Sequence, residues 1–379
     1  MDNVNVTVDD PTVIAKHAED HTDLPPWRFD HLQRMTDSTG IFQHAIYCVP
    51  WFEHGYCTDD NARALLLALM LEELEEGGSE ISRIRSAAAG FLNHALVVEN
   101  GRFRNFMGFN RNWLEEVGSE DSHGRALWAL GAAVGRANHV GFRNWAAERF
   151  QQALPTVANF VWPHSWAFTI LGLHEYLRVL DGDPLASRMR LELSDQLLDW
   201  FVKNSSADWC WGEDIVTYDS ARLPHALILT GRWTRNTAML DMGLRSLRWL
   251  MNAQTTEQGY FRPVGCKGFW HRNSKPACFD QQPLEAAASV SACIEAFHAT
   301  GHAEWKREAR RAFEWFLGAN DLRLPVYDAS TGGCCDGLEE GRLNMNQGAE
   351  STLSFLLALA EMRSLQNTTP GTRAHAVSR

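Results

Sequence analysis

Carboxylic acids stand directly before several long apolar segments of this sequence. Asp60 precedes the apolar run 62–71, Asp121 precedes 126–135, Asp280 precedes 283–297 and Glu350 precedes 353–362. Two carboxyl groups placed on either side of a glycosidic bond can hydrolyse it, one as general acid and the other as base or nucleophile. The arrangement therefore raises the question of which elements bring such acids together.

The apolar segments alternate with amphipathic ones along the whole chain. A segment that is apolar on nearly all sides is typical of a buried helix, whereas a single apolar stripe is typical of a helix at the surface. We expect buried helices at 59–76, 121–136, 164–180, 219–231, 280–299 and 347–364. We expect amphipathic helices at 27–38, 80–97, 142–159, 185–203, 236–253 and 303–318, with a kink near Pro155.

This alternation predicts an all-α protein, an (α/α)6 toroid with six inner and six outer helices. The six helix pairs form a divergent repeat, and an inner ring wrapped by an outer one satisfies both patterns at once. An open superhelix of helix pairs is the rival architecture, but it would leave one apolar inner face in water. We divide the chain into an N-terminal arm at 1–26, one barrel domain at 27–364 and a disordered tail at 365–379.

Loop lengths place the acids on one face of this toroid. Connections into the buried helices are mostly long and connections out of them are short, so the long loops gather where the buried helices begin. Long loops on a rigid scaffold commonly carry function. Any single acid at a helix start can simply cap that helix, but five acid-bearing starts on one face favour a site.

We therefore expect the catalytic residues among the acids Asp60 and Asp121 first, and Asp280 and Glu350 second, and we expect an inverting mechanism. Arg63 and Arg125 follow the first two acids at helical spacing and are expected to pair with them. Amides, acids and aromatic faces suit a sugar. The predicted substrate-binding residues are Trp51, His54, Tyr56, Asp59, Asn110, Trp113, Glu120, His123, His164, Trp211, Asp219, Arg262, Trp270, Gln281 and Gln347.

Composition narrows the range of partners. The formal net charge of −12 disfavours nucleic acid and anionic membranes, and no apolar run reaches the ~18 residues of a membrane span. The first residues lack a secretory signal and the eight cysteines are scattered, so a reducing cytoplasm is expected. We find no motif for a cofactor and expect no metal; the oligomeric state stays open.

Two other functions remain open at this stage. A sugar epimerase or isomerase would use the inner-helix histidines His123, His164, His174 and His225 as acid and base. A non-catalytic partner of a glycosyltransferase would bind a glycan and lose affinity, but no reaction, when one acid is removed. Hydrolysis of an oligosaccharide or glycoside is the leading hypothesis.

The strings HGYCTDDNARAL, NRNWLEEVGSEDSHGRALWALG, FDQQPLEAA and NQGAESTLSFLLAL carry a resemblance. The chain resembles the six-hairpin glycosidase superfamily, which includes unsaturated glucuronyl hydrolases, several endoglucanase families and, more distantly, N-acylglucosamine 2-epimerases. It also looks like uncharacterised bacterial proteins encoded near glycosyltransferases and mannoside-acting enzymes. The resemblance implies an (α/α)6 barrel. By helix position alone, it also implies proton transfer by Asp60 and Asp121.

Overall fold

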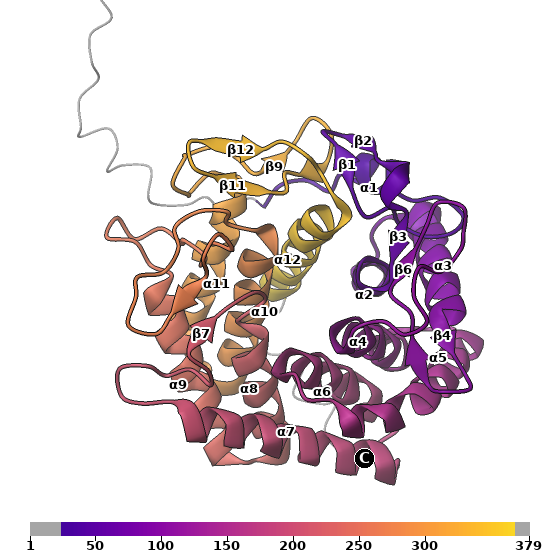
Figure 1. Cartoon of the computed structure of the whole chain (residues 1–379), viewed down its shortest axis with the longest axis horizontal. Helices are drawn as coiled ribbons and strands as arrows, with labels where there is room; N and C mark the ends of the chain where they lie inside the picture. Colours follow the sequence, from indigo (N-terminus) through magenta and orange to yellow (C-terminus); the bar gives the residue numbers. More distant parts are fainter. Residues whose placement is uncertain (1–23, 368–379) are drawn as a thin grey trace, which may run out of the picture.

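Twelve helices of the part of the chain that the structure describes, residues 24–367 of a computed structural model, alternate between an inner and an outer ring (Figure 1). The inner helices are α2 (Thr58–Glu73), α4 (Glu120–Arg136), α6 (Pro163–Leu177), α8 (Arg222–Thr234), α10 (Pro283–Thr300) and α12 (Ala349–Asn367). The outer helices are α1 (Asp30–Arg34), α3 (Gly78–Ala95), α5 (Val140–Ala153), α7 (Pro184–Asn204), α9 (Thr237–Ala253) and α11 (Ala303–Glu314). The predicted (α/α)6 toroid is confirmed.

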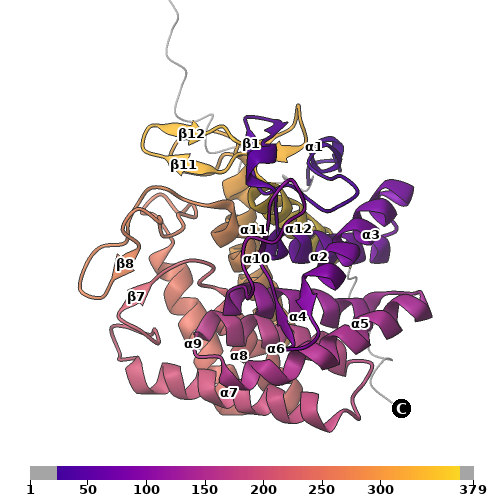
Figure 2. The ribbon, with the colours of Figure 1, turned by 45° about the vertical axis from the view of Figure 1, so that its right-hand side comes forward.

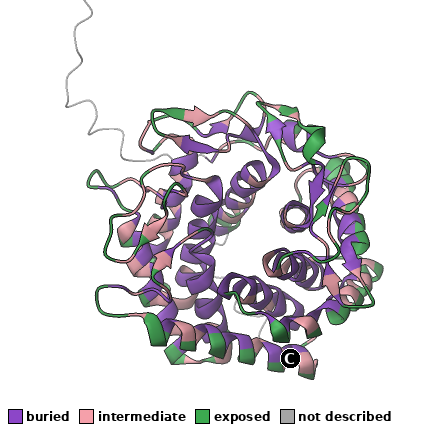
Figure 3. Cartoon of the chain, viewed as in Figure 1, coloured by how far each residue is buried: buried purple, intermediate pink, exposed green. Residues whose placement is uncertain are grey.

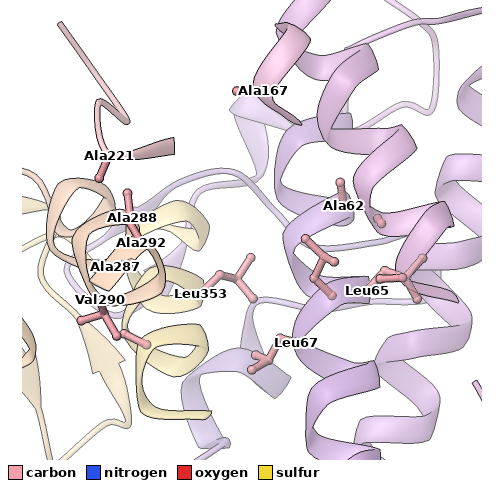
Figure 4. Packing of buried hydrophobic residues seen from close by; sticks show 14 of the residues in the cluster. Ala62, Leu65, Leu67, Ala167, Ala221, Ala287, Ala288, Val290, Ala292 and Leu353 are labelled. Atoms are coloured by element: carbon pink, nitrogen blue, oxygen red, sulfur yellow. The ribbon is translucent and has the colours of Figure 1, made fainter. Parts of the chain in front are cut away.

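The inner ring closes because α12 packs against α2, so the last inner helix meets the first (Figure 1). Burial follows the two sequence patterns: the inner helices are buried nearly all round, and exposed residues lie on the outer helices and loops (Figure 3). Figure 4 shows part of the packed interior, with Val290 of α10, Leu353 of α12 and Leu65 of α2. A closed ring therefore covers the inner apolar surfaces that an open superhelix would expose.

Helix α4 approaches α6 very closely. A side chain at Gly131 would place its Cβ 2.1 Å from the carbonyl oxygen of Gly172, so both positions are restricted to glycine. The backbones can touch only because neither residue carries a Cβ. This contact sets the spacing of two inner helices that begin at the same face.

Several predicted helix boundaries differ from the structure for local reasons. Helix α8 begins at Arg222 rather than 219, and α10 begins at Pro283 rather than 280, because Asp219 and Asp280 have positive φ angles of 48° and 51°. Left-handed backbone cannot continue into a helix, whereas proline suits its first turn. The outer helix predicted at 27–38 is only the short α1.

The helix predicted at 142–159 changes type before Pro155. Helix α5 ends at Ala153 and a 3-10 segment, η3 (Leu154–Asn159), follows. Further 3-10 segments are η2 (Phe52–His54) and η4 (Trp315–Leu317). Helix α12 extends to Asn367, past the predicted start of the tail, while residues 1–23 and 368–379 lie outside the described part.

The connections at the starts of the inner helices carry short antiparallel strands (Figure 2). The pairs are β1 (Ala45–Ile46) with β2 (Val49–Pro50), β3 (Tyr56–Cys57) with β6 (Phe106–Met107), β4 (Leu96–Val97) with β5 (Arg102–Phe103), β7 (Ile215–Val216) with β8 (Trp270–His271), β9 (Tyr327–Asp328) with β10 (Gly333–Cys334), and β11 (Gly337–Glu339) with β12 (Arg342–Asn344). We call this end of the barrel, where the inner helices begin, the mouth.

Within residues 24–367 no helix is both long enough and apolar enough to cross a lipid bilayer.

Candidate functional site

Two of the four predicted catalytic acids meet at one arginine. Arg63 of α2 donates from Nη1 to Asp60 Oδ1 at 2.8 Å and from Nη2 to Glu350 Oε2 of α12 at 2.6 Å. Only 7% of the Asp60 side chain is exposed, against 42% of Glu350. The expected pairing of Arg63 with Asp60 is confirmed, and the contact between α12 and α2 adds Glu350.

Burial sets the proton affinity of Asp60. Loss of hydration raises the pKa of this carboxyl to about 6, although the Arg63 guanidinium acts in the opposite direction. The Cys57 thiol lies 3.1 Å from Asp60 Oδ2, and the Cys57 sulfur also accepts the backbone N–H of Asp60 as the cap of α2. Asp60 is therefore a carboxyl held in one position, and its protonation changes near neutral pH.

Arg125 does not pair with Asp121, so that prediction is wrong. Its Nη2 donates to Asp219 at 2.7 Å, and its Nε lies 3.4 Å from Asp59. Asp219 is fully buried; burial alone would raise the pKa of its carboxyl, but Arg125 and Arg222 hold that pKa below its usual value. Three inner helices and the turn before α8 are thereby joined through buried charges.

Asp121 belongs to a second cluster, with Tyr218 and His164. The Tyr218 hydroxyl donates to Asp121 Oδ2, and the Tyr218 ring stacks on the His164 ring at 4.5 Å with 15° between the planes. Burial, reinforced by Asp121, raises the pKa of the Tyr218 hydroxyl, and burial lowers the pKa of His164. Nε2 of His164 is buried and has no hydrogen-bond partner.

Three other acids at the mouth bond the backbone that leads into inner helices. Glu120 accepts the two backbone N–H groups before α6 at 2.9 and 3.1 Å, and Asp336 accepts one before α12 at 2.7 Å. Glu285 accepts the backbone N–H groups of the turn before α8. Burial raises the pKa of Asp336 to about 6 and, together with Asp219, that of Glu285 to about 8. The bonded N–H groups precede the helices and neither α6 nor α8 has a side-chain cap, so the capping role expected of acids at helix starts does not apply to Glu120 or Glu285.

Asp280 stands apart from both clusters. Its backbone is left-handed, its carbonyl oxygen accepts the N–H of Cys266 at 3.0 Å, and its carboxyl raises the pKa of that thiol further, after burial. Within residues 24–367, no hydrogen bond or ion pair joins Asp280 to Asp60 or Asp121, so its carboxyl lies outside both clusters.

A group of aromatic side chains lies beside Glu350. Trp51 is 37% exposed and meets His54 edge-on at 4.2 Å, and His54 meets His44 at 4.9 Å. Burial, reinforced by His54, lowers the pKa of His44, and Glu350 opposes this shift. The carbonyl oxygen of Gln43, next to His44, accepts the N–H of Ala349, next to Glu350, at 2.9 Å. Trp51 and His54 were predicted as binding residues, and they lie on the same side of the mouth as Glu350.

The remaining predicted binding residues use their polar side-chain atoms inside the protein or lie in the core. The first group comprises Tyr56, Asn110, Trp113, His123, Arg262, Trp270, Gln281 and Gln347. Trp211 is 1% exposed and packs in the core. For His123, burial lowers the pKa to about 3, so its ring is neutral at physiological pH. We do not build the proposed function on these residues.

Sequence reasoning missed two residues of the mouth, Tyr218 and Glu285. Tyr218 is separated from Asp121 by 97 positions, and Glu285 lies inside the apolar stretch of α10 yet bonds the turn before α8. No spacing within either segment signals these partners, because they depend on how neighbouring helices pack.

No protein-family model matches the sequence, and comparison with the curated proteins found no match. Solved structures do match. The cellobiose 2-epimerase from Bacillus thermoamylovorans B4167 is 10% identical, with a TM-score of 0.68, 87% of this chain covered and 95% of that one. The cellulase Cel9M of C. cellulolyticium is 9% identical, with a TM-score of 0.61 and coverages of 86% and 88%.

A third similar structure is an inactive variant of the alpha-1,6-mannanase of Salegentibacter sp. HEL1_6, bound to alpha-1,6-mannotetrose. It is 12% identical, with a TM-score of 0.59, 88% of this chain covered and 97% of that one. At these identities the likeness concerns the fold alone: the chain shares its (α/α)6 barrel with these proteins. The similar structures include both epimerases and hydrolases of carbohydrates.

Proposed function

We propose that the protein is a glycoside hydrolase whose carboxyl pair is Asp60 and Glu350. The observation that carries the proposal is that these two acids, from α2 and α12, bond opposite terminal nitrogens of the single Arg63 guanidinium. Hydrolysis of a glycosidic bond requires two carboxyl groups about 5–9.5 Å apart, and a shared guanidinium holds two acids in that range.

The environments of the two acids suggest their roles. Asp60, with a pKa of about 6, retains a proton on part of the molecules at neutral pH and is the proposed proton donor to the leaving oxygen. Glu350 is the more exposed of the two and is the proposed base for an incoming water. This assignment corresponds to inversion at the anomeric carbon. Asp121, our other leading candidate, is proposed to orient the sugar together with Tyr218.

The comparisons support this proposal in one respect. The inactive mannanase variant carries changes at two consecutive aspartates. This chain has consecutive aspartates, Asp59 and Asp60, at the start of α2, where Asp59 contacts Arg125. Similar structures hold cellobiose and mannotetrose, which supports an oligosaccharide substrate.

A sugar epimerase or isomerase is the second candidate, and a specific observation favours it. His164 combines a buried, unpartnered Nε2 with a stacked Tyr218 and a neighbouring Asp121, so it could move a proton on a bound sugar. The similar structures also include a sugar epimerase and a D-mannose isomerase. By contrast, His174 and His225 have pKa values lowered by burial to about 4 and 3.

Mass spectrometry of an oligosaccharide pool incubated in ¹⁸O-water tests both candidates. The pool contains β-linked glucose and α-linked mannose oligomers, and Asp60→Asn, Glu350→Gln and His164→Asn run beside the wild type. Hydrolysis places ¹⁸O in new reducing ends, and we expect its rate to fall ~10²–10⁴-fold in the first two variants only.

The controls separate the alternatives. Glu120→Gln changes an acid that bonds the backbone before α6 and should retain most of the labelled product. Products of unchanged mass but altered retention that disappear in His164→Asn would replace hydrolysis with epimerisation. Glycan binding without any product would contradict both and leave a non-catalytic binding role.

A further inference from the structure

Three buried arginines line one small cavity inside the inner ring. Arg63 of α2, Arg125 of α4 and Arg222 of α8 contribute their side chains, and Trp128 and Ser354 complete the polar and aromatic lining among aliphatic groups. The cavity has a volume of about 10 Å³. Each arginine is no more than 5% exposed, so all three guanidinium groups are removed from bulk water.

The hydrogen-bond donors of these arginines are only partly used. Arg63 donates to acids through Nη1 and Nη2, and Arg125 donates through Nη2, but Nε of Arg63 has no partner. For Arg222, neither Nε nor Nη1 has a hydrogen-bond partner, although Nε lies 3.4 Å from Asp219 Oδ1. Its guanidinium also lies over the Trp128 ring at 4.9 Å. A buried guanidinium without acceptors is costly, and such donors commonly indicate an ion or water.

The neighbouring acids supply only part of the missing acceptors. Asp219 bonds Arg125 and forms an ion pair with Arg222 through Nε, but Nη1 of Arg222 has no acceptor. Glu285, which is next to Asp219, has a pKa raised by burial to about 8 and is therefore neutral at physiological pH. Carboxylates bind Arg63 and Arg125. The unpartnered donors of Arg222 are left facing the cavity.

We propose that this cavity binds a single monovalent anion of chloride size, held by Arg63, Arg125 and Arg222. A volume of about 10 Å³ has room for one small occupant. A halide accepts N–H groups from several directions at once, as three converging guanidinium groups require. The bound anion links α8 to α2 and α4 and stabilises the charged mouth from below.

The direct test is a crystal structure of the wild-type protein grown in sodium bromide, with data collected at the bromine absorption edge. We expect an anomalous peak between the three guanidinium groups. A density without anomalous signal would show that the site holds water only and would overturn the proposal. This readout does not depend on any activity, so it stands apart from the test of hydrolysis.

Thermal unfolding gives a second readout. At constant ionic strength, replacing sodium gluconate with sodium chloride should raise Tm saturably, by ~4 °C at a hundredfold excess over Kd. Arg222→Met should abolish the chloride-dependent rise, while Arg232→Met, on the same helix but paired with Glu295, should retain it. An equal rise with both anions, or an unchanged rise in Arg222→Met, would contradict the site.

Discussion

Glu285 should make the wild-type protein less stable as the pH rises. Its carboxyl is 4% exposed, accepts two backbone N–H groups before α8 and faces the ionised Asp219. Burial, and then Asp219, raise its pKa from 4.5 to about 8. Between these two values the folded chain keeps a proton that the unfolded chain has released.

The sign and size of the effect follow from this difference. The contribution of Glu285 to stability is fully present below pH 4.5 and is lost as the pH rises through 8. Since one pKa unit corresponds to about 1.4 kcal/mol, the loss is about 5 kcal/mol over the whole range. Glu285→Gln cannot ionise and retains a carbonyl oxygen as acceptor, so it escapes this loss.

Urea unfolding of both proteins at pH 5, 6, 7 and 8 measures the effect. The free energy of unfolding of Glu285→Gln minus that of the wild type should increase by about 1.4 kcal/mol per pH unit. Glu175→Gln is the matched control. Burial raises the pKa of Glu175, but Arg136 outweighs it and lowers the value to about 2, so this variant should differ from the wild type by a constant amount. A flat difference for Glu285→Gln as well would refute the reasoning.

Three further predictions concern the mouth and the helix packing. Arg63→Met should lower the free energy of unfolding by about 3 kcal/mol in urea titrations, because it leaves a buried carboxyl without its cation, whereas Arg28→Met at an exposed pair should change little. If Asp60 is the proton donor, kcat/KM for hydrolysis should fall as the pH rises through about 6, and a pH-rate profile without that limb would contradict its role. Gly131→Ala should lower the thermal midpoint, because its Cβ meets a carbonyl oxygen of α6 at 2.1 Å, whereas Gly90→Ala, in open space on α3, should stabilise by ~0.5–1 kcal/mol.

The sequence was informative wherever a pattern was local. Apolar periodicity predicted which helices lie inside, and the acids at the starts of those helices lie at the mouth of the barrel. The i,i+3 spacing of Asp60 and Arg63 was sufficient to predict their ion pair. These features depend on residues within one helix turn or on the repeat itself.

Long-range charge pairing could not be predicted in the same way. Arg125 has the helical spacing to reach Asp121, yet it bonds Asp219, 94 positions away, because the inner helices converge. Similarly, Gln281 resembles a binding residue in the sequence, but the chain fold brings Trp315 and Asp321 to its amide. Which neighbour a polar side chain meets was decided by helix packing, which a single sequence does not specify.

The acids that bond the backbone before α6 and α8 also bear on how the mouth can be changed. Glu120 belongs to α4 and Glu285 to α10, so the backbone that enters α6 and α8 is held by another inner helix. The connections at 154–160 and 205–217 that lead toward these helices also contribute to the core, through Leu154 and Val157 in the first and Trp209 and Trp211 in the second. New sugar recognition is therefore best grafted onto the exposed positions of these connections, with their length and their core residues retained.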